Sequence, residues 1–417
     1  METRQYLRHY AMLFSGSAAG QLVNLLSYPF LARLYSPSDF GGFAIFVAAS
    51  AIPAAIACAR FDLAIPTAPR HGRFAIVWLS YSAGIVIASA AGLLGAAYWL
   101  SMGTHGALLL AVLLAFAVAI TGFCNATNLF LMRHDRYRLT SASVFTRTAA
   151  AVAAQLLFAL VLRNSWGLIL GYCLGLLCQA AMLIPSLARV MGRKRPRVRQ
   201  MRAMVSRYGR QVTADIPGTL VGAWALFAAP FIIQLLYGPS AVGFYSVGQR
   251  MAVIPLQLFN DSLSQIFFQK AARAQEERGT FWRETKFNLL VSGVLSFGIL
   301  VPLVLLARPL INIYLGAQWA PTATILIILA PMLAVRSLTM SIATTVYVIQ
   351  KAHWLMLHNV ATMVILVVSL GAAYVTGASL ETFLTILSVL SAIEFAVFGG
   401  LLVRAARTQP QRAGQLA

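Results

Sequence analysis

Long apolar runs recur along the whole chain and are separated by short polar or basic segments. A transmembrane helix needs about 20 mainly apolar residues to cross roughly 30 Å of hydrocarbon, and many of these runs reach that length. The pattern predicts an all-α polytopic membrane protein with about twelve membrane-spanning helices. These spans are expected near residues 10–33, 39–60, 74–100, 106–132, 140–162, 166–188, 211–236, 240–268, 287–307, 322–349, 354–376 and 380–403.

The composition agrees with this pattern. Of the 417 residues, 59% are hydrophobic and only 10% are charged, whereas soluble domains carry about 25% charged residues. The net charge of +21 does not predict a nucleic-acid partner, because the basic residues lie in short clusters between apolar runs. The four cysteines lie inside apolar runs without a CxxC pattern, so neither a disulfide framework nor a zinc site is expected.

The lysines and arginines predict an orientation. In a twelve-span arrangement, most of the 32 basic residues fall in segments on the same side as both termini, and only Arg33, Arg163 and Arg308 fall in segments opposite. Cytoplasmic loops carry the Lys/Arg excess in membrane proteins, so both termini are expected in the cytoplasm. The first apolar run follows Arg4 and Arg8 but is too long for a signal peptide, and we expect it to be retained as a helix.

An internal repeat appears when the chain is compared with itself at a shift of 202 positions. Leu34, Tyr35, Pro37, Ser38, Gly41, Ile52 and Pro53 recur as Leu236, Tyr237, Pro239, Ser240, Gly243, Ile254 and Pro255. The repeat aligns the first span with the seventh and predicts two parallel six-helix lobes, an arrangement found in secondary transporters. The expected lobes are residues 1–188 and 211–417, joined at 189–210 by a basic cytoplasmic connector that would contact anionic lipid headgroups.

Ionisable side chains inside the bilayer are costly, and by default they face a bundle interior or a wet cavity. The candidates inside predicted spans are Arg147, Arg250, Arg336 and Glu394. Arginines that converge between two lobes would suit an anionic headgroup, because a guanidinium binds phosphate oxygens in pairs and keeps its charge in a low dielectric. The alternative is that each arginine pairs with Glu394, Asp215, Asp261 or free carbonyls and only holds helices together.

Uncharged polar residues give further candidates for a substrate cavity. Gln21 and Asn24 lie in the first span and Gln249 lies in the eighth. Such side chains either bind sugar hydroxyls or hydrogen-bond between helices. Pro53 and Pro255 occupy matching positions in the repeat and are expected to kink the second and eighth spans, as bending points or as packing kinks.

Several other kinds of chemistry are not predicted. All six histidines lie at or near span ends, so neither a buried histidine relay nor a metal site is expected. The sequence has no GxxxxGK[ST] motif, and no catalytic residue or resident cofactor is predicted. At the cytoplasmic end of the second span, Arg60 and Asp62 are expected to form a local ion pair.

Four stretches of the chain carry a family likeness. They are residues 31–41 (LARLYSPSDFG), 60–65 (RFDLAI), 263–271 (LSQIFFQKA), and 316–319 (GAQW) followed by 329–331 (LAP). In these stretches the sequence resembles the oligosaccharide flippases of bacterial polysaccharide and O-antigen synthesis. That family lies within the multidrug/oligosaccharidyl-lipid/polysaccharide exporter (MOP) superfamily.

The resemblance implies a pair of six-helix lobes around a central cavity in the bacterial inner membrane. The implied cargo is a polyprenyl-diphosphate-linked oligosaccharide, turned between leaflets by alternating access for O-antigen, capsule or exopolysaccharide synthesis. The implied partners are this lipid-linked oligosaccharide, membrane lipids and other glycan-assembly proteins, with Na⁺ or H⁺ open as a coupling ion. No binding residue is carried over from the family, so the arginines remain an inference from the residues themselves.

Two other functions compete with this expectation. A drug/cation antiporter of the same superfamily would need an intramembrane acidic cluster for Na⁺ or H⁺, and the first lobe offers only Asp62, near a helix end. A polysaccharide polymerase or ligase would, by resemblance, carry a large periplasmic loop, whereas the longest exterior segment expected here runs from Ala307 to Pro321. We therefore expect a flippase rather than an antiporter or an enzyme.

Overall fold

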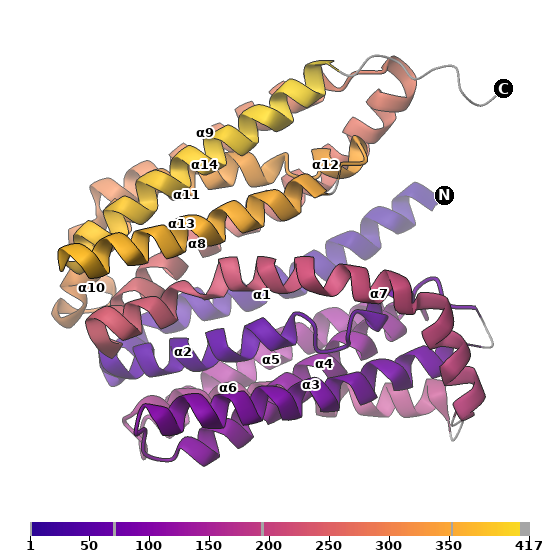
Figure 1. Cartoon of the computed structure of the whole chain (residues 1–417), viewed down its shortest axis with the longest axis horizontal. Helices are drawn as coiled ribbons and strands as arrows, with labels where there is room; N and C mark the ends of the chain where they lie inside the picture. The colour runs from indigo at the N-terminus through magenta and orange to yellow at the C-terminus, as the bar shows by residue number, and fades with distance from the viewer. Residues whose placement is uncertain (1, 70–71, 193–195, 352, 409–417) are drawn as a thin grey trace. The chain divides into compact units, whose positions relative to one another are not determined.

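The protein is built from α-helices joined by short turns (Figure 1). The computed structural model describes residues 2–69, 72–192, 196–351 and 353–408, with side-chain surroundings from Gly16 onward, Ser17 and Gln211 excepted. No strand occurs in the described ranges, and two short 3-10 helices, η1 (Phe61–Ala64) and η2 (Ala317–Trp319), complete the secondary structure there. The prediction of an all-α protein is therefore confirmed.

Eight helical stretches in the described part of the chain are long and apolar enough to cross a membrane. They take in every predicted span except those at 10–33, 39–60 and 140–162. Those three ranges also form helices, namely α1 (Glu2–Leu34), α2 (Pro37–Ala54) and α5 (Tyr137–Phe158). The chain is a multi-pass membrane protein, as the apolar pattern predicts.

The helices group into two compact units, Met1–Pro230 and Phe231–Ala417. Besides α1, α2, η1 and α5, the N-terminal unit contains α3 (Arg73–Ser101), α4 (Ala107–Met132), α6 (Ser165–Met191) and α7 (Val198–Phe227). Since α7 packs against α2, α3 and η1, the helix expected to open the second lobe groups with the first unit. The division falls after Pro230, whereas the sequence pattern placed it at residues 189–210.

Local chemistry explains how α2 begins. Ser36 is its N-cap, and the Ser36 Oγ accepts a hydrogen bond from the Asp39 backbone N at 3.3 Å. In return, the Asp39 carboxylate accepts one from the Ser36 backbone N at 3.0 Å, which completes a capping box. Pro37 stands at the first helical position, where its missing N–H costs nothing. The Ser-Pro-Ser-Asp part of the first family stretch is therefore a helix-start signal.

Small residues let two helices of the N-terminal unit pack closely. Gly167, Gly171 and Gly175 recur at four-residue spacing along α6, and all three are buried. A Cβ added at Gly171 or Gly175 would meet backbone atoms of α5, the helix against which α6 packs. Spacing of this kind is typical of close helix pairs in membranes.

The C-terminal unit contains the remaining helices. They are α8 (Ala229–Arg278), α9 (Trp282–Leu305), α10 (Ala307–Tyr314), α11 (Ala320–Ser341), α12 (Thr345–Val348), α13 (His353–Thr376) and α14 (Leu380–Thr408). α8 is interrupted at Gly238, whose φ of 80° and ψ of 179° are non-helical, and Pro239 follows. This break agrees with the expected gap between the spans at 211–236 and 240–268.

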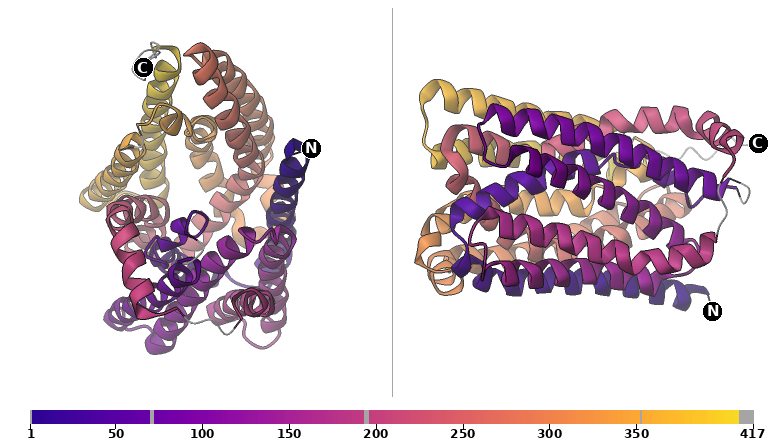
Figure 2. Two further views of the ribbon diagram at one scale, coloured as in Figure 1. Left: turned by 90° about the vertical axis from the view of Figure 1, so that its right-hand side faces the viewer. Right: turned by 90° about the horizontal axis from the view of Figure 1, so that it is seen from below.

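The same helix pairs recur in both units, and in Figures 1 and 2 the helices within each unit lie side by side. The pairs α3–α4, α4–α6 and α5–α6 of the N-terminal unit correspond to α9–α11, α11–α14 and α13–α14 of the C-terminal unit. The Tyr35 hydroxyl donates to the Gln155 carbonyl oxygen near the end of α5, at 2.8 Å. Its repeat partner Tyr237 donates to the Ala378 carbonyl oxygen just after α13, at 3.0 Å. The packing within each unit supports the internal repeat, and the rotation that relates the halves stays a prediction.

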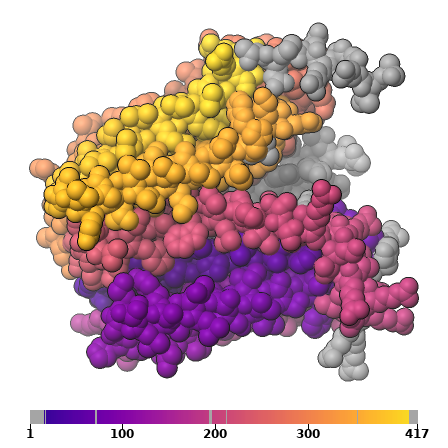
Figure 3. All heavy atoms as spheres, viewed as in Figure 1, coloured from indigo at the N-terminus to yellow at the C-terminus, as the bar shows by residue number. Residues whose placement is uncertain are grey.

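Apolar side chains cover the outer faces of several helices. On α3, Leu93 and Leu94 are 74% and 73% exposed, and the surface of this helix is visible in purple in Figure 3. On α13, Val364 and Val367 are each 54% exposed. Exposed apolar surface of this extent indicates contact with lipid, as the hydropathy pattern predicts.

Candidate functional site

A cavity of about 300 Å³ lies between α8 and α11 in the C-terminal unit. Its lining residues recur at three- and four-residue intervals, so each helix contributes one face. From α8 these residues are Val253, Leu256, Gln257, Asn260, Asp261 and Ser264, and from α11 they are Leu333, Arg336, Ser337 and Met340. Apolar and polar groups thus share the wall of one cavity within otherwise apolar helices.

Arg336 supplies the positive charge of this cavity. It lies inside the apolar helix α11 and is half-buried. Among the residues that the structure describes, ion pairs include Arg60–Asp215, Arg278–Glu284 and His358–Glu394, and none is found for Arg336. Asp261 lines the same cavity but lies beyond ion-pair distance of the guanidinium. An arginine inside a membrane helix is expected to face a cavity or a partner, and Arg336 faces a cavity.

A polar network fixes the wall of the cavity beside Arg336. The Asn260 amide Nδ2 donates a hydrogen bond to the Ser337 Oγ at 2.8 Å. The Ser337 Oγ also lies 2.6 Å from the Ser296 Oγ of α9, so three helices are joined at this point. Because Ser337 directly follows Arg336, this network holds the α11 backbone from which the guanidinium projects.

The remaining polar groups define what the cavity could bind. The guanidinium presents five N–H donors and suits a phosphate or carboxylate. Gln257 and Ser264 add donors and acceptors that suit hydroxyl groups, and Asp261 adds acceptors alone. A volume of about 300 Å³ is at the lower end for small-molecule pockets. The cavity therefore matches a small anionic group rather than a whole oligosaccharide.

The structure distributes the other predicted site residues over both units. Arg147 lies on α5 in the N-terminal unit and is half-buried, and Gln21 and Asn24 lie half-buried on α1, which packs against α5. Gln249 and Arg250 lie half-buried on α8 but are not among the residues that line the α8–α11 cavity. The structure thus groups Arg336 with Asn260 and Asp261, and convergence of the three arginines stays a prediction.

The two repeat-matched prolines differ in their local effect. Pro53 is the next-to-last residue of α2, which ends at Ala54 and passes into tight turns through hydrogen bonds such as Ile56 N to Pro53 O at 3.1 Å. Pro255 lies inside α8, where the only non-helical backbone described is at Gly238. Pro53 therefore lies at the end of a helix and not in its middle, whereas a kink of α8 at Pro255 stays a prediction.

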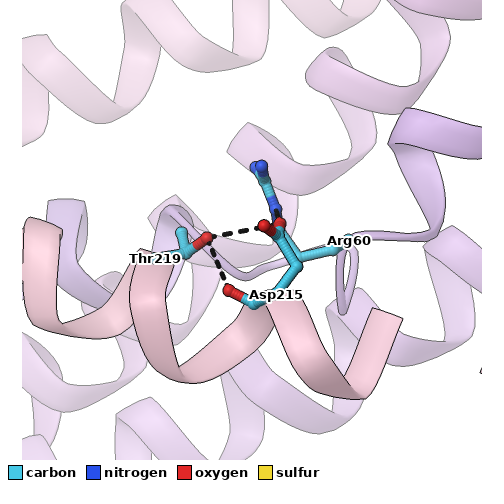
Figure 4. Close-up of polar contacts among 3 residues, drawn as sticks. All are labelled: Arg60, Asp215 and Thr219. Atoms are coloured by element: carbon cyan, nitrogen blue, oxygen red, sulfur yellow. Dashed lines mark hydrogen bonds and ion pairs between the residues drawn. The ribbon is translucent and has the colours of Figure 1, made fainter. Parts of the chain in front are cut away.

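The predicted ion pair between Arg60 and Asp62 is wrong. The Arg60 Nε instead contacts the Asp215 carboxylate of α7 at 2.5 Å, and Thr219 Oγ1 donates to the Asp215 carbonyl oxygen at 3.0 Å (Figure 4). Arg60 has a φ of 62°, a left-handed conformation that turns the chain between α2 and η1. Desolvation by burial raises the pKa of Asp62, and the charge of Arg60 opposes that shift. The Arg60–Asp215 ion pair links the start of η1 to α7 beside a second cavity of about 310 Å³.

Glu394 has a partner that the sequence pattern did not predict. Its Oε1 lies 2.6 Å from His358 Nδ1, and the two side chains are only 12% and 6% exposed. His358 lies five residues into α13, which begins at His353, and so near the start of its span as expected. The expectation concerned a histidine relay or a metal site, and it did not predict this buried contact of His358 with Glu394. The only sequence signal was one acid and one histidine in neighbouring spans.

Comparisons with known proteins identify the family. The family model described as "Polysaccharide biosynthesis protein" matches residues 30–324. No sequence among curated proteins matches the chain. Among solved structures, "Lipid II flippase MurJ, inward closed conformation" is similar at a TM-score of 0.72 and 13% identity, covering 97% of this chain and 88% of that one.

Two further structures of transporters have a similar fold. An inward-facing multidrug resistance MATE family transporter of the MOP superfamily has a TM-score of 0.64 at 14% identity, with 95% of both chains covered. A MOP superfamily transporter from Pyrococcus furiosus, whose title states a reversed polarity of the binding pocket, has a TM-score of 0.63 at 15% identity, with 96% of both chains covered. At these identities the structures show the fold alone. The family match covers most of the chain and confirms the resemblance: this multi-pass membrane protein belongs to the polysaccharide biosynthesis protein family and has the MOP transporter fold.

Proposed function

We propose that this protein is a flippase that moves a polyprenyl-diphosphate-linked oligosaccharide across the bacterial inner membrane by alternating access. The observation that carries the proposal is Arg336, a guanidinium that lines a cavity inside an apolar helix and is in no described ion pair. In a member of the polysaccharide biosynthesis family, the anionic group that such a site suits is the diphosphate of a lipid carrier.

The physical barrier to flipping is the polar headgroup, because a charged group in hydrocarbon is strongly disfavoured. A guanidinium held in the same low dielectric offsets part of that cost by binding phosphate oxygens in pairs. Gln257 and Ser264 would hydrogen-bond the headgroup beside Arg336, while the oligosaccharide extends out of this small cavity and the polyprenyl tail stays in lipid. This division of labour needs no chemical change in the cargo, so the proposed activity is transport and not catalysis.

The similar structures agree in kind with this proposal. One is described as a lipid II flippase and another as a multidrug resistance transporter, so the same fold occurs in a flippase and in a drug transporter. The family match favours the lipid-linked glycan. We place both termini in the cytoplasm, from the Lys/Arg distribution. The proposed partners are the lipid-linked oligosaccharide, membrane lipids and other glycan-assembly proteins.

The test is flipping by purified protein in proteoliposomes. A fluorescent, short-chain polyprenyl-diphosphate oligosaccharide is placed in both leaflets, and a membrane-impermeant glycosidase or quencher reports the accessible fraction over time. We expect the wild-type protein to make the inner pool accessible and Arg336→Gln to slow this strongly. The matched control is Arg308→Gln, which removes an exposed arginine of α10 in the same unit.

The outcomes separate the competing functions. No transfer above that of empty liposomes would reject the proposal. Transfer that is as fast in Arg336→Gln as in Arg308→Gln would keep the flippase and reject the role of the α8–α11 cavity. A polymerase or ligase would change the length of the glycan or its attachment, which chromatography of the recovered lipid detects. A drug antiporter would move an organic cation and leave the lipid pool in place.

A further inference from the structure

The buried pair His358–Glu394 lies outside the α8–α11 cavity and has no part in the proposed recognition of the headgroup. His358 projects from α13 and Glu394 from α14, two helices that pack against each other in the C-terminal unit. The Nδ1 to Oε1 distance is 2.6 Å. Two ionisable side chains in such close contact inside apolar helices are rare in a membrane protein and are functional candidates by default.

The surroundings of the pair are apolar on the histidine side. The His358 ring stacks on Phe398, with centroids 4.5 Å apart and planes 10° apart, and it is tilted against Phe395 at 5.1 Å. Phe398 also belongs to a buried cluster that joins α8, α12 and α14. Water is thus excluded from the ring faces, and the orientation of the imidazole is fixed.

The Glu394 carboxylate lacks a hydrogen-bond partner for one of its two oxygens within the described part of the chain. Glu394 Oε2 is buried and has no hydrogen-bond partner among the described residues. This oxygen has lost the hydrogen bonds that water would supply, and that loss is costly in apolar surroundings. A proton shared between the carboxyl group and the imidazole makes the pair neutral overall, whichever of the two groups holds it.

Titratable groups of both signs lie on the helices around the pair. The helices that pack against α14 are α9, α11, α12 and α13, and they carry Arg283, Glu284, Lys286, Arg336, Tyr347, His353 and Tyr374. α14 itself adds Glu381, Arg404 and Arg407.

We propose that His358 and Glu394 form a proton-binding site that couples transport to the proton gradient. In the buried form the pair holds one proton on the hydrogen bond between Nδ1 and Oε1. When α13 and α14 admit water, that proton leaves to the solvent, and a neutral imidazole beside an ionised carboxylate remains. The coupling role rests on the proposed flippase function, whereas the proton site itself can be measured without any cargo.

The first test measures the proton directly. Infrared difference spectra between acidic and alkaline buffers are recorded on purified protein in lipid nanodiscs. We expect a change from protonated carboxyl to carboxylate that Glu394→Gln removes and that His358→Asn shifts to a different pH. The matched controls Glu381→Gln and His353→Asn change an exposed acid and an exposed histidine on the same two helices and should leave the signal intact.

The second test measures coupling in proteoliposomes. A pH difference across the membrane should accelerate flipping by the wild-type protein. In Glu394→Gln, the ratio of the flipping rates with and without the gradient should fall to about one. A ratio of one means that the gradient no longer drives flipping. If size-exclusion chromatography shows that Glu394→Gln does not fold, the same ratio of flipping rates is measured in His358→Asn. Both controls should keep the wild-type ratio.

The results test the proton site, the flippase function and the coupling role separately. An infrared carboxyl change that persists in Glu394→Gln overturns the proton site. If Glu394→Gln abolishes the infrared carboxyl change but the wild-type protein does not flip the lipid, the proton site is supported and the proposed flippase function is rejected. If sodium replacing choline at constant pH abolishes the protonated-carboxyl signal, the site binds sodium and the proton proposal is wrong. A gradient response that both variants retain overturns the coupling role.

Discussion

The close packing of α5 against α6 predicts a specific steric cost at Gly171. A Cβ placed there would lie 2.8 Å from the Gln155 backbone N and 3.1 Å from the Gln155 Cα, whereas ordinary contacts begin near 3.4 Å. Gly171→Ala therefore requires the two helices to part by about 0.6 Å, from the difference between 3.4 and 2.8 Å. Overpacking of this kind costs about 1–3 kcal/mol.

Gln155 cannot move aside without further losses. Its amide Nε2 donates to the Leu168 carbonyl oxygen at 3.0 Å, and its own carbonyl oxygen accepts from the Tyr35 hydroxyl. Displacement of this residue would weaken both hydrogen bonds, so relaxation around the new methyl group is restricted. The cost of Gly171→Ala is therefore expected in the upper half of that range.

The assay is thermal unfolding of detergent-purified protein, followed by fluorescence-detected size-exclusion chromatography. At about 2–4 °C per kcal/mol for a unit of 150–250 residues, a range that includes Met1–Pro230, Gly171→Ala should lower Tm by a few degrees up to about 10 °C. The matched control is Gly371→Ala in α13, where a Cβ meets nothing within 4 Å. That change should leave Tm unchanged or raise it, because alanine favours helix by about 0.5–1 kcal/mol. Equal Tm values for the two variants would refute the packing argument.

Three further predictions concern the polar groups. The Arg336→Lys variant should bind the diphosphate lipid about 10- to 100-fold more weakly, because lysine loses one of the two charged hydrogen bonds and each contributes about 1.5–3 kcal/mol. A binding isotherm with wild-type affinity would reject the bidentate contact. A double-mutant cycle of Arg60→Ala and Asp215→Ala in thermal unfolding should give a coupling energy of about 0.2–1 kcal/mol, since the side chains are 24% and 45% exposed; zero coupling would show that the pair adds no stability. Tyr35→Phe should lower stability by about 1–3 kcal/mol and Tyr237→Phe by less, because Tyr35 is only 2% exposed and its loss leaves a buried acceptor unpaired. The opposite order would contradict this reasoning.

Hydropathy alone predicted most of the helical architecture. An apolar run long enough to cross a membrane forms a helix wherever it lies, because no water is available to satisfy its backbone groups. The helix-start signal at Ser36, Pro37 and Asp39 and the break at Gly238 are also local, so they follow from a few adjacent residues. The recurrence of Tyr35 as Tyr237 predicted an internal repeat, and both hydroxyls bind a carbonyl near the end of the corresponding helix.

Tertiary packing decided which polar groups meet. Arg336 was recognisable in the sequence as a costly charge, but its place beside Asn260 depends on how α8 rests on α11. Arg60 bonds Asp215 and not the nearby Asp62, because a left-handed turn directs it toward α7. Hydropathy fixes which segments become helices and leaves their rotation open, and rotation determines whether His358 and Glu394 face each other or the lipid. The sequence by itself determined the membrane-spanning helices and their repeat, whereas side-chain packing between distant helices determined the cavity and the buried pair.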